Sequence, residues 1–260
     1  MRRRGGTDDL PRPVPPHDAH THTTFSDGRN SVLENVRAAE AVGLECVAIT
    51  DHIQLDTTDL GERLHDIQRS AERAQVTVLP GAECTILDPE GHLSVAPDHA
   101  RRLKFILADF GGRTQGIGSE VPADPSRVLE NVFQAYGSVV RGGVVHALAH
   151  PFNLGRFQAV FYPEDLPRSR LRELARLMFD EEVAFEIMNQ MYWWYPDLSV
   201  GEFTRQYAGL LTIFGRENVK FVVGSDAHSA GAVGSSFWCR RVMKLAGIEL
   251  SQLVDLRSLA

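Results

Sequence analysis

The stretch "HDAHTHTTFSDG", residues 17–28, holds three of the chain's ten histidines within six residues and then an Asp-Gly turn. In an extended segment, residues two apart point to the same side, so His20 and His22 can face one metal ion. Imidazole is the commonest metal-binding side chain. Taken alone, a His-x-His pair is more often two loop or core histidines, so its meaning depends on the rest of the sequence.

Outside this stretch, short apolar runs alternate with longer segments of helical period. Seven strands are predicted at 17–20, 46–50, 76–79, 105–108, 144–149, 183–187 and 221–224. Six helices are predicted at 31–42, 59–74, 125–141, 167–181, 201–214 and 236–245. Ser31 and Glu34 form a capping box at the start of the first helix. Strand and helix in repeated alternation predict a parallel sheet.

Candidate metal ligands fall where these strands end. They are His20 and His22 after the first strand, Asp51 and His52 after the second, Glu83 after the third, His150 after the fifth, Glu186 at the end of the sixth, and Asp226 and His228 after the seventh. Each could by itself be a cap, a turn or a surface residue. A sheet closed into a barrel gathers the carboxyl ends of its strands at one mouth, whereas an open doubly wound sheet spreads them along a line. The joint placement therefore favours a closed barrel.

The types of these residues suit a metal centre. Asp226 and His228, in "GSDAH", repeat the spacing of two that His20 and His22 show. Glu83 offers two oxygens, enough to bridge two cations. A mixed set of nitrogen and oxygen ligands is typical of Zn, Mn or Fe rather than of a Ca or Mg cage.

In chain order, the motifs "DAHTHTTFSDG", "AITDH", "GAE", "AHP" and "GSDAH" resemble those of the PHP (polymerase and histidinol phosphatase) family over residues 17 to about 235. The resemblance implies an α/β fold, a distorted (β/α)7 barrel, and a site of two or three metal ions that hydrolyses phosphoesters. It also implies three ligand groups: His20, His22, Glu83 and Asp226 for one ion, Glu83 and His150 for a second, and Asp27, His52 and His228 for a third. His17 lies outside the motif and is expected in the tail or in strand packing.

The fourth strand departs from the family pattern. Where members carry a histidine for the second ion, "LKFILADFGG" places Gly111 or a near neighbour. Asp109 shares strand parity with Gly111 and is the preferred substitute ligand, while His92 or His99 could fold in from the preceding loop. If none serves, the second ion is weakly held and the site is effectively binuclear or impaired.

Other residues are candidates for contact with substrate. Arg156 is either a phosphate clamp, because a guanidinium matches phosphate bidentately, or a solvated loop arginine. Glu186 and Asn189 are expected to support ligands or to touch substrate. Trp193 belongs to "MYWWYPD", whose aromatic side chains either pack beneath their loop or wall a pocket for a ring-bearing substrate.

The expected chemistry is metal-assisted hydrolysis. Two cations roughly 3.5–4 Å apart, bridged by Glu83 and a hydroxide, would activate that water, while a third would hold phosphate oxygens. Asp226 is expected to act with Glu83, and Asp51 to orient a ligand or to move a proton. The formal net charge of -7 excludes a broad basic face, so a small phosphomonoester, such as histidinol phosphate or a nucleoside phosphate, is the expected substrate.

Two other functions stay open. One is a small exonuclease or phosphodiesterase that acts on nucleotides or short oligonucleotides. The other is a non-catalytic barrel that keeps metals for structure or senses a nucleotide, which the departure on the fourth strand favours. Against the second, a structural metal site is normally closed by protein ligands rather than spread over several strand ends.

Composition sets the organisation of the chain. With 43% hydrophobic residues, 260 residues can build one domain, expected at 17–260 and preceded by a flexible Pro/Arg-rich tail at 1–16. Cys46, Cys84 and Cys239 lie in apolar runs, which is typical of reduced thiols in a cytosolic core. No apolar run approaches the roughly 20 residues that cross a bilayer, so we expect a cytoplasmic protein with no membrane partner.

Overall fold

The computed structural model describes residues 15–260, and the expected tail at 1–16 lies outside them except for its last two positions. The strands are β1 (His17–Asp18), β2 (Cys46–Ile49), β3 (His52–Ile53), β4 (Thr77–Ile86), β5 (Phe105–Phe110), β6 (Ala147–Leu148), β7 (Ala184–Met188) and β8 (Phe221–Gly224). They pair in parallel in the order β1-β2-β4-β5-β6-β7-β8, with β3 on β4. The predicted parallel sheet is confirmed.

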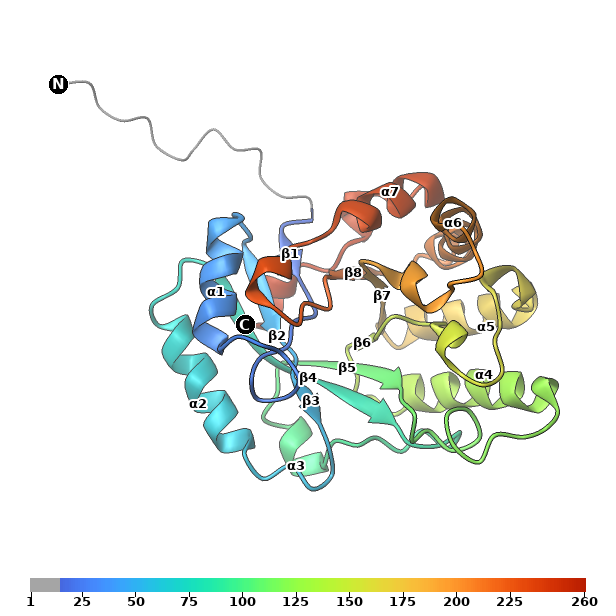
Figure 1. Cartoon of the computed structure of the whole chain (residues 1–260), viewed down its shortest axis with the longest axis horizontal. Coiled ribbons are helices and arrows are strands. Elements are labelled where there is room, and N and C mark those ends of the chain that lie inside the picture. Colours follow the sequence, from blue (N-terminus) through green and yellow to red (C-terminus); the bar gives the residue numbers. More distant parts are fainter. Residues whose placement is uncertain (1–14) are drawn as a thin grey trace.

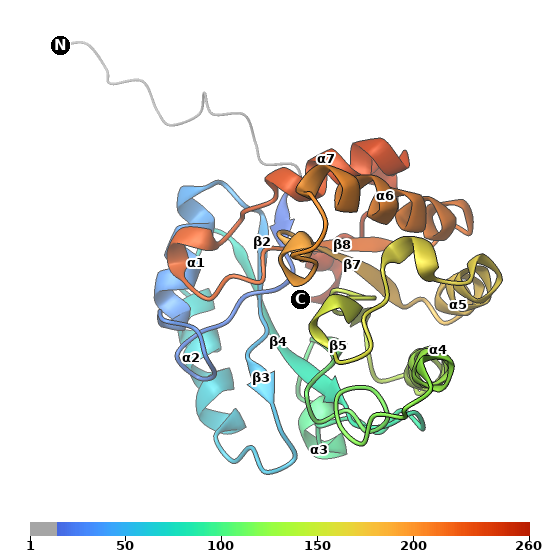
Figure 2. The same cartoon turned by 45° about the vertical axis from the view of Figure 1, so that its right-hand side comes forward.

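The two ends of this sheet meet, which makes the nearly closed barrel seen in Figures 1 and 2. The Ala19 N–H donates a hydrogen bond to the Val223 carbonyl at 2.9 Å. Further along the same seam, Thr21 pairs in parallel with Ala227. The distorted barrel predicted from the strand ends is therefore the observed fold.

Helices surround the barrel on its outer side (Figure 2). The α-helices are α1 (Val32–Ala41), α2 (Leu60–Ala71), α3 (Pro97–Ala100), α4 (Pro125–Arg141), α5 (Arg168–Asp180), α6 (Val200–Arg216) and α7 (Phe237–Ala246). The predicted capping box of Ser31 and Glu34 is present at the start of α1. None of the helices within residues 15–260 is long and apolar enough to cross a membrane.

Apolar side chains fill the barrel and the layer between strands and helices. Inside the barrel, the packed residues include Ala19, Leu79, Leu107, Ala147 and Val222. Because neighbouring side chains on a strand alternate between faces, the intervening residues pack outward against the helices. This filled interior leaves the mouth, at the carboxyl ends of the strands, as the place for polar groups.

Two strands are longer than predicted. The sequence "PG" at Pro80 and Gly81 is a turn signal, yet β4 passes through it to Ile86. The strand changes partners there: residues 77–80 pair with β2, and residues 81–86 pair with β5. As a result Glu83 lies within β4 and Asp109 lies within β5, rather than after them. β3 and α3, both very short, were not predicted.

Candidate metal centre

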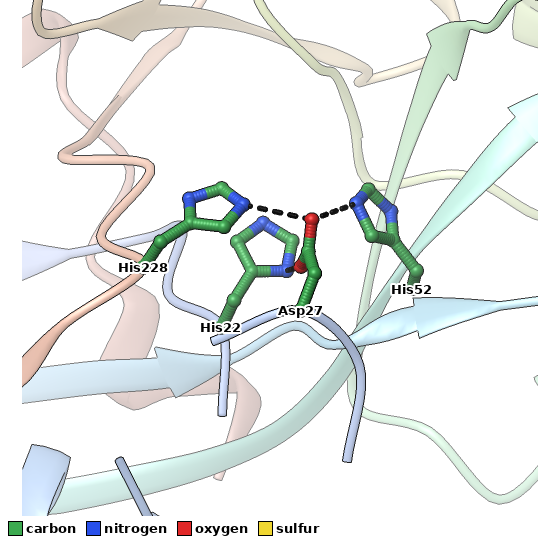
Figure 3. A group of neighbouring side chains, drawn as sticks. All are labelled: His22, Asp27, His52 and His228. Carbon is green, nitrogen blue, oxygen red and sulfur yellow. Dashed lines mark hydrogen bonds and ion pairs between the residues drawn. The ribbon is translucent and has the colours of Figure 1, made fainter. Parts of the chain in front are cut away.

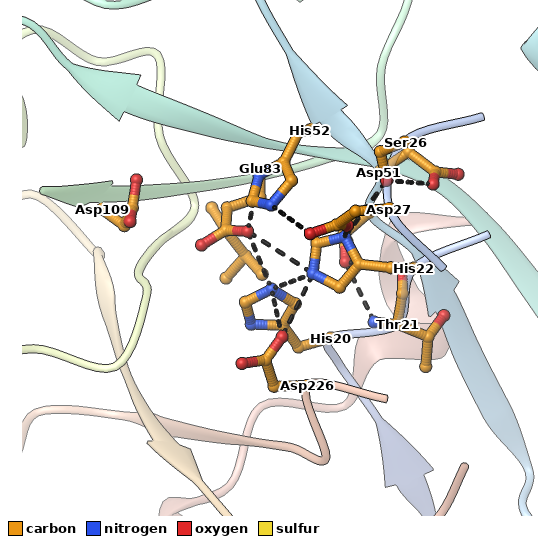
Figure 4. Close-up of polar contacts among 12 residues, drawn as sticks. His20, Thr21, His22, Ser26, Asp27, Asp51, His52, Glu83, Asp109 and Asp226 are labelled. Carbon is orange, nitrogen blue, oxygen red and sulfur yellow. Dashed lines mark hydrogen bonds and ion pairs between the residues drawn. The ribbon is translucent and has the colours of Figure 1, made fainter. Parts of the chain in front are cut away.

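The loop after β1 carries the first candidate ligands and is held by Asp51. The Asp51 carboxylate accepts hydrogen bonds from the backbone N–H and hydroxyl of Thr23, both at 2.7 Å, and from the Ser26 hydroxyl at 2.6 Å. These contacts fix the turn between His22 and Asp27 (Figure 4). They agree with the expected role of Asp51 in orienting ligands, while its role in moving a proton stays a prediction.

The Glu83 carboxylate lies at the centre of the site and is almost fully buried. Its Oε1 is 3.0 Å from His150 Nε2. Its Oε2 is 3.2 Å from His20 Nε2 and 3.0 Å from His52 Nδ1. One carboxylate thus reaches histidines from three different parts of the barrel mouth, as a bridging ligand requires. Figure 4 shows Glu83 with two of them, His20 and His52.

His20, His22 and Asp226 form a second close set. The Nε2 atoms of His20 and His22 are 3.0 Å apart, and His22 Nε2 is 3.1 Å from Asp226 Oδ1. Asp226 has a φ of 54° and His150 a φ of 31°, both in the left-handed region that non-glycine residues seldom adopt. Backbone strain of this kind clusters at functional sites, where the surrounding structure holds it.

A third set lies nearer to solvent (Figure 3). Asp27 Oδ2 is 3.1 Å from His228 Nε2 and 3.6 Å from His52 Nε2, and Asp27 Oδ1 is 3.6 Å from His22 Nδ1. The side chains of Asp27, His228 and His52 are 54%, 41% and 38% exposed, whereas His22 is buried. This side of the site is therefore open to a ligand from solvent.

The eight motif residues come together in three overlapping groups of potential ligands. Within residues 15–260 these groups are His22, Asp27, His52 and His228; His20, His22 and Asp226; and His20, Glu83 and His150. In each group the ligand atoms lie within 4.8 Å of one another. The division resembles the three expected sets, with His22 and His20 shared between neighbouring groups.

The charges of these groups are balanced against one another. Burial would raise the pKa of Glu83, but the His20 charge and a hydrogen bond from His150 hold that pKa well below its usual range. Burial would lower the pKa of His20, but the carboxylates of Glu186 and Glu83 raise it well above its usual value. Burial would also lower the pKa of His52, but the contact with Glu83 raises that pKa to about 9. Divalent cations would supply this positive charge and displace the protons, so the donor set fits divalent metal ions.

Glu186 lies behind the ligands and is fully buried. Its Oε1 is 2.8 Å from His20 Nδ1, and its Oε2 accepts a hydrogen bond from the His150 backbone N–H at 2.6 Å. Holding one imidazole nitrogen in this way turns the other toward the centre of the site. This position agrees with the expectation that Glu186 supports ligands, and not with the alternative that it contacts substrate.

Two residues expected near substrate lie elsewhere. Asn189 is buried, and its side-chain oxygen accepts from the Trp238 N–H at the start of α7 at 3.1 Å. Trp193 is 68% exposed, while its neighbour Trp194 lies edge-on to the His150 ring at 5.1 Å. Asn189 is thus bonded to α7, and its contact with substrate stays a prediction; Trp194 rather than Trp193 is the aromatic residue beside the candidate ligands.

Arg156 lies beside the site and is half-buried. It donates a hydrogen bond to Asp109 Oδ2 at 2.8 Å and another to the Phe110 carbonyl. Its guanidinium also lies 5.2 Å from the ring centres of Phe157 and Trp194. These contacts contradict the expectation of a freely solvated loop arginine, and the expected phosphate clamp stays a prediction.

None of the substitutes expected for the fourth-strand histidine belongs to the three groups within residues 15–260. Asp109 is paired with Arg156 and lies to one side of the contacts around Glu83 (Figure 4). Burial raises its pKa, and the Glu83 charge raises it further. His92 pairs with Asp88 at the surface, and His99 lies in α3, ahead of β5. The preferred substitution by Asp109 is therefore not seen.

Sequence reasoning missed two supporting residues. Asn153, with its amide oxygen turned toward His150, accepts a hydrogen bond from His150 Nδ1 at 2.9 Å. Asp18 is buried and accepts from the backbone N–H groups of His20 and Ser225 at 3.2 and 2.8 Å. The sequence signal for them was spacing, since Asn153 follows His150 by three residues and Asp18 precedes His20 by two.

A nearly closed parallel barrel with clustered histidines and carboxylates at the carboxyl ends of its strands defines a metal-binding (β/α) barrel protein. The sequence model of the PHP domain matches residues 18–190. Because the match covers more than half of the chain, the protein belongs to the PHP domain family, and the family predicted from the motifs is confirmed.

Relatives and solved structures agree with this assignment. A "Probable phosphatase" of Thermoanaerobacter sp. (strain X514) is 27% identical over 89% of this chain and 86% of its own length. Another, from Acetivibrio thermocellus, is 27% identical over 84% of this chain and 81% of its own. The crystal structure of the "putative histidinol phosphatase hisK" of Listeria monocytogenes has the same fold, with a TM-score of 0.63, 14% identity, and coverage of 85% of this chain and 98% of that one. The enzyme class predicted from the motifs, a hydrolase of phosphoric esters, is the class that these names give.

Proposed function

We propose that the protein is a metal-dependent phosphatase that hydrolyses a small phosphomonoester. The observation that carries this proposal is the open side of the metal centre, where Asp27, His52 and His228 remain 38–54% exposed above buried ligands. A structural metal site is closed by protein groups, whereas a catalytic site keeps access for substrate. The names of the relatives support the same class of reaction.

When bound, two or three divalent ions would neutralise the phosphate and lower the pKa of the attacking water. Glu83, whose two oxygens reach His150 and His52, would be among the residues that hold the ions. Asp226 would complete the buried set with His20 and His22. Asp51 holds the loop that carries His22, so its part in the reaction is to fix ligand geometry.

The chain's own phosphate contact would be Arg156. Its guanidinium is already fixed by Asp109 and by the Trp194 ring, so little side-chain entropy is lost when an oxyanion binds. The ring of Trp194 borders both Arg156 and His150, so it would offer an apolar surface to a leaving group bound there. A leaving group with a ring, as in histidinol phosphate or a nucleoside phosphate, fits this surface.

The test combines elemental analysis with hydrolysis of p-nitrophenyl phosphate before chelation, after it, and after Mn or Zn is added back. We expect two or three ions per chain and turnover that follows their removal and return. His22→Ala should abolish metal binding and turnover. His92→Ala, which changes a surface histidine paired with Asp88, is the matched control. Bound metal without turnover of any phosphate ester would overturn the proposal.

A substrate panel tests the finer part of the proposal. Phosphomonoesters with and without ring-bearing leaving groups should be hydrolysed, and dinucleotides should not. Trp194→Ala should raise KM for ring-bearing monoesters more than for glycerol phosphate. Hydrolysis of diesters alone would show that the protein is a phosphodiesterase instead.

A further inference from the structure

The group formed by His20, Glu83 and His150 has fewer ligands than its outer neighbour. It offers three ligand atoms, as does the group of His20, His22 and Asp226, whereas the group around Asp27 offers four. It also shares His20 with the set that includes Asp226. Because divalent ions of this class take four or more ligands, this group is incomplete by at least one, which water, substrate or a further side chain can supply.

The protein places a carboxylate near this group but gives it another partner. In the sheet, Leu107 of β5 lies opposite Glu83, and Asp109 lies opposite Thr85, two positions closer to the mouth. Since residues two apart share a face, Asp109 lies on the face of β5 that Leu107 turns into the barrel. Yet its Oδ2 accepts a hydrogen bond from Arg156 rather than facing a ligand group.

Arg156 is linked to the same group from its other side. With its amide oxygen turned toward them, Asn153 accepts from His150 Nδ1 at 2.9 Å and from Arg156 Nη2 and Nε at 3.1 Å. Asp109, Arg156, Asn153 and His150 thus form a continuous chain of hydrogen bonds that ends at the incomplete group. The carboxylate of Asp109 is therefore held by a guanidinium that is itself linked to this group.

We propose that Arg156 and a divalent cation at the His20–Glu83–His150 group compete for the carboxylate of Asp109. The inference rests on the proposed metal centre. It follows that this ion binds more weakly than the ions at the other groups, because the Arg156 charge is linked to this group and holds Asp109.

The test is titration of the chelated, full-length protein with Zn²⁺ and with Mn²⁺ by calorimetry, with elemental analysis to count bound ions. For the wild type we expect a last ion at least about tenfold weaker than the others. Arg156→Gln should tighten that last ion about tenfold or more, because Asp109 becomes free. Asp109→Asn should leave it weak, and the double variant should resemble Asp109→Asn.

The double variant separates competition from simple charge. If removal of the arginine charge tightens binding equally in the Asp109→Asn background, Asp109 is not the contested ligand and the inference is overturned. Arg170→Gln removes the same charge from α5, where Arg170 packs on Phe133, and should change nothing. Should Arg156→Gln not fold, Arg156→Lys carries the test, since a single ammonium cannot make all the contacts of the guanidinium.

Wild-type behaviour distinguishes the two proposals. If the wild type binds no ions, the proposed function fails and the inference fails with it. If it binds all its ions with equal affinity, the metal centre stands and only the competition for Asp109 is overturned.

Discussion

At the scale of single residues, two buried carboxylates of this site act through other side chains. The Asp51 carboxylate hydrogen-bonds to Thr23 and Ser26, and the Glu186 carboxylate hydrogen-bonds to His20 and to the backbone of His150. The positions of both could be read from strand ends, but their partners could not. Strand parity tells which face a residue occupies and says nothing of the side chain it meets there.

Glu186→Gln should weaken metal binding about 10- to 100-fold while the fold survives, because the neutral amide no longer polarises the His20 imidazole. The dissociation constant, measured by competition with a chelator, and the circular dichroism spectrum check both parts. Glu181→Gln, an exposed change at the end of α5, is the control. Unchanged affinity in a folded Glu186→Gln variant would remove the positioning role.

At the scale of elements, the alternation of strands and helices could be predicted because its signals are local. The lengths of β4 and β5 could not, since pairing with neighbouring strands overrides the turn signal at Pro80 and Gly81. The end of β8 shows a similar dependence on neighbours. A Cβ on Gly224 would lie 2.0 Å from Glu186 Oε1 and 2.6 Å from His20 Cβ.

Gly224→Ala should therefore cost about 1–3 kcal/mol of unfolding free energy, as overpacking of a buried site does. It should also weaken metal binding, because Glu186 and His20 must move apart. Gly209→Ala in α6, where an added Cβ meets nothing within 4 Å, should be neutral or stabilising by up to about 1 kcal/mol. Urea unfolding of the two variants compares them, and equal small effects would show that the end of β8 tolerates a side chain.

At the scale of the whole molecule, His17 helps to close the barrel. Its Nε2 accepts a hydrogen bond from the Val223 N–H of β8 at 3.1 Å. Burial lowers the pKa of His17 to about 4, only partly offset by Asp255. Strand packing was one of the two places expected for this residue from the sequence, and it is the one observed.

His17 binds a proton near pH 6.5 in the unfolded chain but only near pH 4 in the folded chain. The contribution of neutral His17 to stability is therefore fully present above pH 6.5 and is lost as pH falls toward 4. Between pH 7 and pH 5 this loss amounts to about 2 kcal/mol. His17→Gln keeps an acceptor for Val223 but removes the titration, so its unfolding free energy should fall less over that range. Urea unfolding of both proteins at the two pH values measures the difference, and equal losses would contradict the assignment.

The sequence alone determined the parallel barrel, its strand order along the chain and seven of the eight candidate ligands at its mouth, because periodicity and parity decide which face each residue occupies. The eighth candidate, Asp27, came from the resemblance of the motifs to the PHP family. Only the tertiary structure decided that Asp109 pairs with Arg156 and that Asn189 accepts a hydrogen bond from the start of α7. It also decided that Trp194 rather than Trp193 lies beside the candidate ligands. Such choices depend on side chains that arrive from distant parts of the chain, and they are settled when the barrel closes and competing partners meet.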